Sequence, residues 1–253
     1  MILTNQEQYP YEDLRLDYSH RDQPSLLADV IAKIHILCQT IPGGVAVFFP
    51  SYKMLQLFTL TLHTSGTFSA INACKRIFVE TRENPNIFDD YSSYLRSCNE
   101  NENQSNLSNL STDSSTTTGG LLLAVIGGRL SEGINFSDEL GRCVAIVGMP
   151  YANRNDVVLR ERMAYAEKQV QGSGEVLYTN LCMKAVNQTI GRAFRHRNDW
   201  AAIALIDCRY AHSSIRTQLT PWIDSQCHIY KQNKDMQCAL ASFIQSMQNT
   251  KIM

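Results

Sequence analysis

Three side chains in the last third of the chain could act together on a phosphate group. Residues 186–195 read V-N-Q-T-I-G-R-A-F-R, and a helix over this segment would place Gln188, Arg192 and Arg195 on one face at i, i+4 and i+7. Each arginine carries a planar guanidinium with five donors, which suits phosphate oxygens better than any other side chain. Taken alone, the segment fits a solvated basic face equally well.

A second stretch places glycines and polar side chains directly after an apolar run. Residues 127–136 read G-G-R-L-S-E-G-I-N-F and follow the apolar residues 121–126, a pattern that predicts a buried strand ending in a loop. Glycines after a strand can cradle a pyrophosphate, but the spacing G-G-x-x-x-x-G differs from the G-x-G-x-x-G of dinucleotide-binding folds. The chain contains no Gly-Lys dipeptide, so it has no G-x-x-x-x-G-K-[ST] phosphate loop.

Together the two stretches resemble a known family. G-G-R-L-S-E-G-I-N-F is similar to motif V, and Q-T-I-G-R-A-F-R to motif VI, of superfamily 2 DNA helicases of the XPD type, the iron–sulfur DNA helicases. The flanks G-I-N-F-S-D-E-L-G-R-C-V-A-I-V-G-M-P-Y and N-L-C-M-K-A-V-N-Q-T-I-G-R-A-F-R-H resemble most the chromosome-loss branch, whose helicases are linked to sister-chromatid cohesion. The similarity runs from about Tyr18 to Trp222, apart from one polar insert.

The resemblance implies roles on the nucleotide side of such a helicase. Arg195 would be the arginine finger, Arg192 a second contact to the γ-phosphate, and Gln188 would orient the arginines or the attacking water. Further nucleotide-binding residues are expected at Glu132, Gly133, Asn135 and Gly191. An arginine finger is worth about 10³ to 10⁵ in rate, so its loss should nearly abolish turnover.

The resemblance places the DNA side at two loops that follow strands. Residues 45–55, V-A-V-F-F-P-S-Y-K-M-L, are similar to motif IV, where a Ser-Tyr corner meets the backbone of the tracked strand. DNA contacts are therefore expected from Ser51, Tyr52, Lys53, Arg129 and Ser131. On spacing alone, the serine is better explained as the N-cap of the following helix.

The elements that must position these residues alternate between strands and helices. Short apolar runs predict strands at residues 45–49, 121–126, 143–147 and 201–206, with a further β-like run at 74–80. Helices are predicted at residues 25–39, 52–63, 156–170 and 175–194. This alternation predicts a parallel α/β sheet flanked by helices, the architecture of the RecA-like second helicase domain. The basic pair Lys75-Arg76 is expected to be solvated, with a DNA-backbone contact as the alternative.

Residues 1–24 are interpreted as an N-terminal extension, and residues 25–253 as one RecA-like domain. Between residues 99 and 120 the composition collapses to Asn, Ser, Thr, Glu and Gly. Such a segment cannot bury a core and is predicted to be a disordered polar insert. It is a loop within the domain because the resemblance resumes on both sides.

The composition is that of an ordinary globular protein. The 253 residues are 44% hydrophobic and 19% charged, with a formal net charge of −1, so DNA binding must rest on a local patch and not on an overall basic field. Eight cysteines without a C-x-x-C pair give little support to zinc, and no metal site is predicted. Neither a signal peptide nor an apolar run of 18 residues is found, so no membrane contact is expected.

The expected function is the C-terminal half of an ATP-dependent 5′–3′ DNA helicase. ATP with Mg²⁺ would be bound mainly by a first helicase domain, in cis or in trans, which also carries the iron–sulfur cluster. The D-E-L-G at residues 138–141 is not the D-E-x-H that holds magnesium, so the chain alone is not expected to hydrolyse ATP. Single-stranded or forked DNA, roles in repair and cohesion, and a nuclear location follow from the resemblance.

Two other interpretations remain open. One is a non-catalytic remnant of such a helicase that binds DNA or a protein partner. The other is an unrelated α/β nucleotide-binding domain. The intact Gln188, Gly191, Arg192 and Arg195 disfavour the second and weaken the first.

Overall fold

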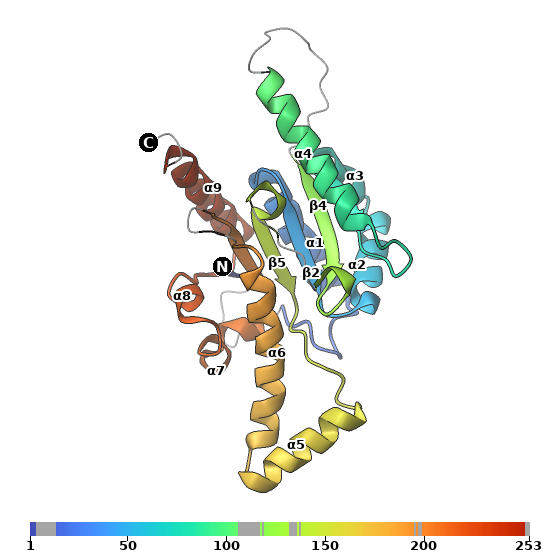
Figure 1. Ribbon diagram of the computed structural model, residues 1–253, viewed down its shortest axis with the longest axis vertical. Coiled ribbons are helices and arrows are strands. Elements are labelled where there is room, and N and C mark those ends of the chain that lie inside the picture. The colour runs from blue at the N-terminus through green and yellow to red at the C-terminus, as the bar shows by residue number, and fades with distance from the viewer. Residues whose placement is uncertain are drawn as a thin grey trace.

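The chain folds around a parallel sheet with helices on both faces (Figure 1). The computed structural model describes residues 1–3, 14–105, 117, 119–131, 136, 138–194, 196 and 199–250. Within that part of the chain, seven strands pair in the order β3-β4-β2-β5-β6-β1-β7, all parallel. In chain order they are β1 (Ile2–Leu3), β2 (Val45–Phe49), β3 (Arg76–Val79), β4 (Gly120–Val125), β5 (Cys143–Val147), β6 (Ala202–Ile206) and β7 (Ile229–Tyr230). The predicted parallel α/β sheet is confirmed.

The helices lie between strands along the chain, except that the last one follows β7 and that only 3₁₀ turns are described between β4 and β5. They are α1 (Pro24–Thr40), α2 (Tyr52–Thr64), α3 (Thr67–Cys74), α4 (Ile87–Ser105), α5 (Val157–Gln169), α6 (Ser173–Gly191), α7 (Ser213–Arg216), α8 (Pro221–Asp224) and α9 (Asn233–Thr250). Short 3₁₀ turns occur at Arg129–Ser131, Asp138–Gly141 and Cys208–Ala211. None of the described helices has the length and apolar character needed to cross a membrane.

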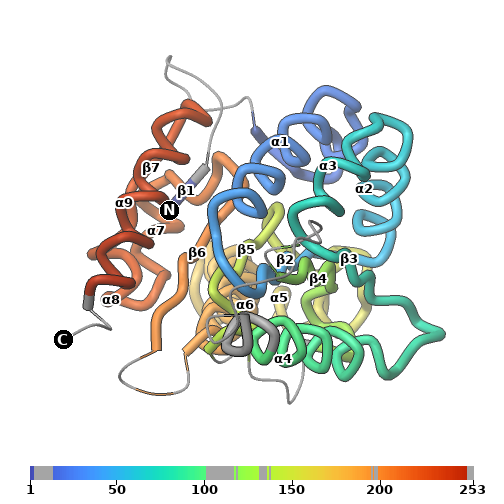
Figure 2. Tube along the Cα trace, turned by 90° about the horizontal axis from the view of Figure 1, so that it is seen from above, coloured from blue at the N-terminus to red at the C-terminus, as the bar shows by residue number. Residues whose placement is uncertain are grey.

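The two helix layers follow from side-chain alternation along the strands. In β2, Val45, Val47 and Phe49 pack in one hydrophobic cluster with residues of α1, α2 and α9. Ala46 and Phe48 point to the opposite face and pack in another cluster with residues of α4, as the two-residue period of a strand requires. Figure 2 shows α1, α2 and α3 on one side of the sheet and α4 and α6 on the other.

Part of the segment interpreted as an N-terminal extension belongs to the domain. β1 pairs with β6 on one side and with β7 on the other. Leu14 and Leu16 are buried in the main core, and the Leu16 backbone N–H donates to the Asp207 carboxylate at 3.1 Å. The apolar residues of this segment are therefore buried in the domain, although the segment as a whole is polar in composition.

The polar insert begins later than its composition suggested. Helix α4 continues to Ser105, and Gly120 already belongs to β4. Asp89 and Asp90 lie in the first turn of α4, where carboxylates stabilise a helix, and extending a formed helix needs no new nucleation. Residues 106–116 and 118 lie outside the described part of the chain.

Lys75 is buried, so the expectation that it is solvated was wrong. It caps α3, where its backbone N–H donates to Ile71 O at 2.8 Å, and it precedes β3 directly. The short turn carries its side chain into the interior, while the neighbouring Arg76 stays exposed. Burial lowers the pKa of the Lys75 ammonium to about 8, against the opposing effect of nearby thiols, of which Cys38 is the foremost.

This burial predicts a pH-dependent stability. Below about pH 8 the native state holds a costly buried charge, and above it the native lysine is neutral while the unfolded chain still binds the proton. The unfolded state then binds more protons, so stability rises with pH up to about 10.4, by about 3 kcal/mol in all. Urea unfolding of the wild type and of Lys75→Met should show that the difference between their free energies of unfolding changes by this amount over that pH range. A difference that stays constant with pH would contradict the assignment.

Candidate functional site

The predicted Ser-Tyr corner lies at the carboxyl end of β2. Ser51 is the N-cap of α2, and its Oγ accepts a hydrogen bond from Met54 N at 3.3 Å. Tyr52 is half-buried and donates its hydroxyl proton to Glu80 Oε1 at 2.8 Å. Lys53 is 67% exposed, with its Nζ 3.9 Å from Asp22 Oδ2. The structure therefore brings the three motif IV residues together, and the serine also performs the capping role that its spacing favoured.

Glu80, which was not among the predicted site residues, joins this corner to β4. Its side chain is buried, and its Oε2 accepts from Val125 N at 2.8 Å while Oε1 accepts from Tyr52. Burial and the Glu80 hydrogen bond raise the pKa of the Tyr52 hydroxyl, whereas a hydrogen bond from the Arg129 backbone lowers it. An acid directly after the apolar run I-F-V was the signal that could have revealed it.

The motif V segment begins next to the Glu80 carboxylate. Gly127 turns the chain at φ +75°, and the next residue, Gly128, is buried against Glu80. A Cβ at Gly128 would lie 2.6 Å from Glu80 Oε1 and 2.9 Å from Val125 O, so a side chain does not fit there. Arg129 follows and is exposed. The predicted site residues Glu132, Gly133 and Asn135, and the side chain of Ser131, lie outside the described residues.

The far end of the motif V segment is fixed to motif VI. The Phe136 backbone N–H donates to Arg192 O at 3.0 Å. The Phe136 ring is fully buried and packs edge-to-face against Phe48 and Phe88, with centroid distances of 5.5 and 5.6 Å. The described ends of the segment thus lie at the Tyr52 corner and at the end of α6.

Helix α6 ends at Gly191, earlier than the predicted residue 194, so Arg192 follows the helix directly and does not lie within it. Arg192 is the C-cap. The Arg192 and Ala193 backbone N–H groups bond three residues back, to Thr189 O and Ile190 O, the tight pattern of a terminating helix. Gly191 disfavours continuation of the helix, and the Arg192 carbonyl accepts a hydrogen bond from Phe136 N. Arg195 lies outside the described residues.

The described motif VI residues differ in their surroundings. Val186 and Ile190 are buried, which anchors α6 to the sheet, whereas Gln188 and Gly191 are exposed and Arg192 is half-buried. Gln188 lines an open groove together with Asn180, Met183, Lys184, Asn187 and Gln218. The face of α6 that carries Gln188 is therefore accessible.

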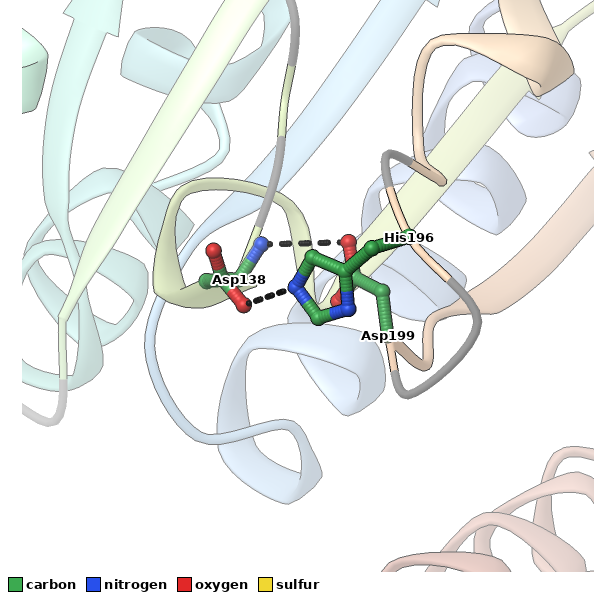
Figure 3. A group of neighbouring side chains, drawn as sticks. All are labelled: Asp138, His196 and Asp199. Carbon is green, nitrogen blue, oxygen red and sulfur yellow. Dashed lines mark hydrogen bonds and ion pairs between the residues drawn. The ribbon is translucent and has the colours of Figure 1, made fainter.

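His196 follows motif VI directly in the chain and forms a cluster with Asp138 and Asp199, here called the Asp138 cluster (Figure 3). Each offers a possible metal-ligand atom, and these atoms lie within 4.8 Å of one another. However, both Asp199 oxygens already accept hydrogen bonds, one from Arg142 Nη1 at 3.0 Å and the other from Asp138 N at 3.3 Å. Hydrogen bonds and an ion pair thus account for the arrangement.

The helicase C-terminal domain family matches residues 34–226. The chain belongs to this family. Similar proteins include the ATP-dependent DNA helicase DDX11 of Mus musculus, 39% identical over 86% of this chain and 24% of that protein. The ATP-dependent DNA helicase chl1 of Schizosaccharomyces pombe is 39% identical over 83% of this chain and 24% of its own length. The predicted membership of the chromosome-loss branch is confirmed, and this helicase C-terminal domain spans about a quarter of those relatives.

Solved structures support the same fold. The structure titled "XPD_Helicase" has a TM-score of 0.61 at 19% identity and covers 90% of this chain and 34% of that one. The "Structure of S. tokodaii Xpd4" has a TM-score of 0.59 at 19% identity, covering 90% and 37%. At this identity the likeness shows the fold alone, and it confirms the predicted helicase-domain architecture.

Two glycines of the site should respond oppositely to alanine. Gly128→Ala should destabilise the chain by about 1 to 3 kcal/mol, because the new methyl group overlaps Glu80 and the Val125 carbonyl. Gly191→Ala meets no atom within 4 Å and should stabilise the end of α6 by up to about 1 kcal/mol. Urea unfolding of the two variants measures both effects, and equal destabilisation would refute the packing described for Gly128.

Proposed function

We propose that this domain is the second ATPase half of an ATP-dependent DNA helicase and works with a first helicase domain in cis or in trans. The observation that carries the proposal is the attachment of the motif V segment at its two described ends. The segment is bonded to the Tyr52–Glu80 corner at one end and to the Arg192 carbonyl at the other. A segment fixed at both ends can couple a nucleotide site to a nucleic-acid site.

On the nucleotide side, Arg192 and Arg195 would reach the γ-phosphate of ATP–Mg²⁺ held by the first helicase domain. Gln188 would orient the arginines or the attacking water, with Glu132, Gly133, Asn135 and Gly191 against the nucleotide. The accessible face of α6 around Gln188 is compatible with an approaching domain. The missing phosphate loop and the iron–sulfur cluster would belong to that domain.

On the DNA side, Ser51, Lys53, Arg129 and Ser131 would contact backbone phosphates. The Ser51 oxygen accepts from Met54 N, which leaves its hydroxyl proton available for a phosphate oxygen. The Tyr52 hydroxyl already donates its proton to Glu80. We therefore assign this tyrosine a positioning role, with its ring facing the DNA strand. Exposed Lys53 and Arg129 supply the charge that phosphate binding requires.

The remaining details rest on the family resemblance of the sequence. Through that resemblance we include in the proposal single-stranded or forked DNA as the ligand, 5′–3′ polarity, a nuclear location and roles in repair and cohesion. ATP binding would draw the two helicase domains together, and hydrolysis would release them. The motif V segment would then alternately tighten and loosen the DNA contacts.

An ATPase assay with the two halves combined tests this proposal. We expect DNA-stimulated turnover when the first helicase domain of a relative is added in trans or fused to this chain. Arg195→Ala should reduce kcat by about 10³-fold or more, because the transition-state charge loses its cation. Arg162→Ala on the exposed face of α5 is the matched control and should leave kcat unchanged.

The same assay separates the alternatives. DNA binding by the combined halves without any turnover would favour a non-catalytic remnant. Turnover that survives Arg195→Ala would remove the finger assignment while leaving the helicase assignment in place.

Phosphate contacts predict a salt-dependent affinity for single-stranded DNA. Lys53→Ala and Arg129→Ala should each weaken binding and lower the slope of log K against log salt concentration by about 0.7, the value for one lost phosphate contact. Lys168→Ala, an exposed lysine of α5, should leave the slope unchanged. Fluorescence anisotropy over a salt series measures these slopes, and equal slopes for all variants would exclude the proposed DNA side.

A further inference from the structure

We propose that His196 and Asp138 form a latch that positions the arginine-bearing segment after α6 against the motif V side of the site. The inference rests on the proposed function for its catalytic meaning, but the contact itself is structural. His196 directly follows Arg195 in the chain, so its anchoring point lies one residue, about 3.8 Å between Cα atoms, from the proposed finger.

The latch is a closed ring of three hydrogen bonds, and Figure 3 draws those that join Asp138 to His196 and to Asp199. His196 Nε2 lies 3.1 Å from Asp138 Oδ1. The Asp138 backbone N–H donates to Asp199 Oδ2 at 3.3 Å, and the Asp199 backbone N–H donates to His196 O at 3.0 Å. The ring thus joins the turn after motif V to the turn after motif VI.

On one side of the ring, Asp199 is held in place by buried contacts. The Asp199 side chain is buried and accepts from Arg142 Nη1 at 3.0 Å and from Trp200 N at 2.9 Å. The same Arg142 nitrogen donates to the Trp200 carbonyl, and the guanidinium lies 4.6 Å from the Trp200 ring centroid. Because Arg142 directly precedes β5 and Trp200 lies just before β6, these contacts are held by the sheet.

The other side of the ring is the part that can open. The side chains of His196 and Asp138 are 48% and 47% exposed, so their contact competes with water. Asp138 adopts φ +55°, a left-handed conformation that aspartate and asparagine tolerate better than most residues. The exposed contact therefore depends on a backbone shape that suits only a few side chains.

Together with the Phe136–Arg192 bond, the latch brackets the segment that carries the arginines. The first attachment is the Arg192 carbonyl on Phe136 N, and the second is His196 on Asp138. One attachment would leave the segment free to turn, whereas two fix its direction. His196 and Asp138 are thus positioning residues, because they would act through the arginines and not on the nucleotide.

Truncating variants in the combined two-domain enzyme test the latch. Asp138→Gly removes the carboxylate and keeps a residue that tolerates the left-handed backbone, and His196→Ala removes the imidazole. Each should reduce kcat about tenfold, the scale on which small misplacements act, with KM for ATP and DNA affinity within twofold of the wild type. The double variant should fall no further than either single one, because both remove the same contact. Additive losses, or kcat values equal to the wild type, would overturn the latch.

Glu175→Gln is the matched control, because it breaks an exposed ion pair with Arg154 that is remote from motif VI. Its kcat should equal that of the wild type. A loss equal to that of the latch variants would show that breaking any surface pair has this effect, and would overturn the latch.

A second measurement separates failure of the latch from failure of the proposed function. If the combined wild-type halves do not hydrolyse ATP, the proposed function fails. The latch is then judged by amide hydrogen exchange of residues 192–200 in this chain. Exchange about tenfold faster in both latch variants, with unchanged exchange in β5 and in Glu175→Gln, would support it. Rates equal to the wild type would overturn it.

Discussion

The arrangement of the site depends on how the motif V segment is held at its two ends. At the start, the buried Glu80 carboxylate accepts from Tyr52 and from the Val125 backbone, and Gly128 packs against it. At the end, Phe136 N donates to the Arg192 carbonyl, and the Phe136 ring is locked between two aromatic rings. A polar loop with only one fixed end would not keep two distant groups in register.

Three buried carboxylates lie beside the ends of β3 and β6. Glu80 follows β3, Asp207 follows β6, and Asp199 lies just before β6; all three side chains are buried. Asp207 accepts from Leu16 N and from Nε and Nη2 of Arg209, the last two at 2.8 Å. A buried carboxylate is tolerated only when such donors surround it, so each acid fixes the path of the chain that supplies its donors.

The sequence predicted the five longer strands because they are short apolar runs, whereas the two-residue strands β1 and β7 were not predicted. The strands at residues 45–49 and 143–147 were predicted to the residue. Local patterns could not show where α6 ends, since the bond from Phe136 to Arg192 joins residues 56 apart in sequence. The burial of Lys75 and the partners of Glu80 depend on such long-range contacts for the same reason, and composition alone could not set the boundary of the polar insert.

The position of β1 constrains the order in which the sheet can be completed. Ile2 and Leu3 lie between β6 and β7, and the amino group of Met1 donates to Ile203 O, 202 residues away along the chain. During synthesis Ile2 and Leu3 must therefore wait for partners that follow about 200 residues later in the chain. Pairings between such distant residues are slow to form, and until then the edge of β6 remains open to wrong partners.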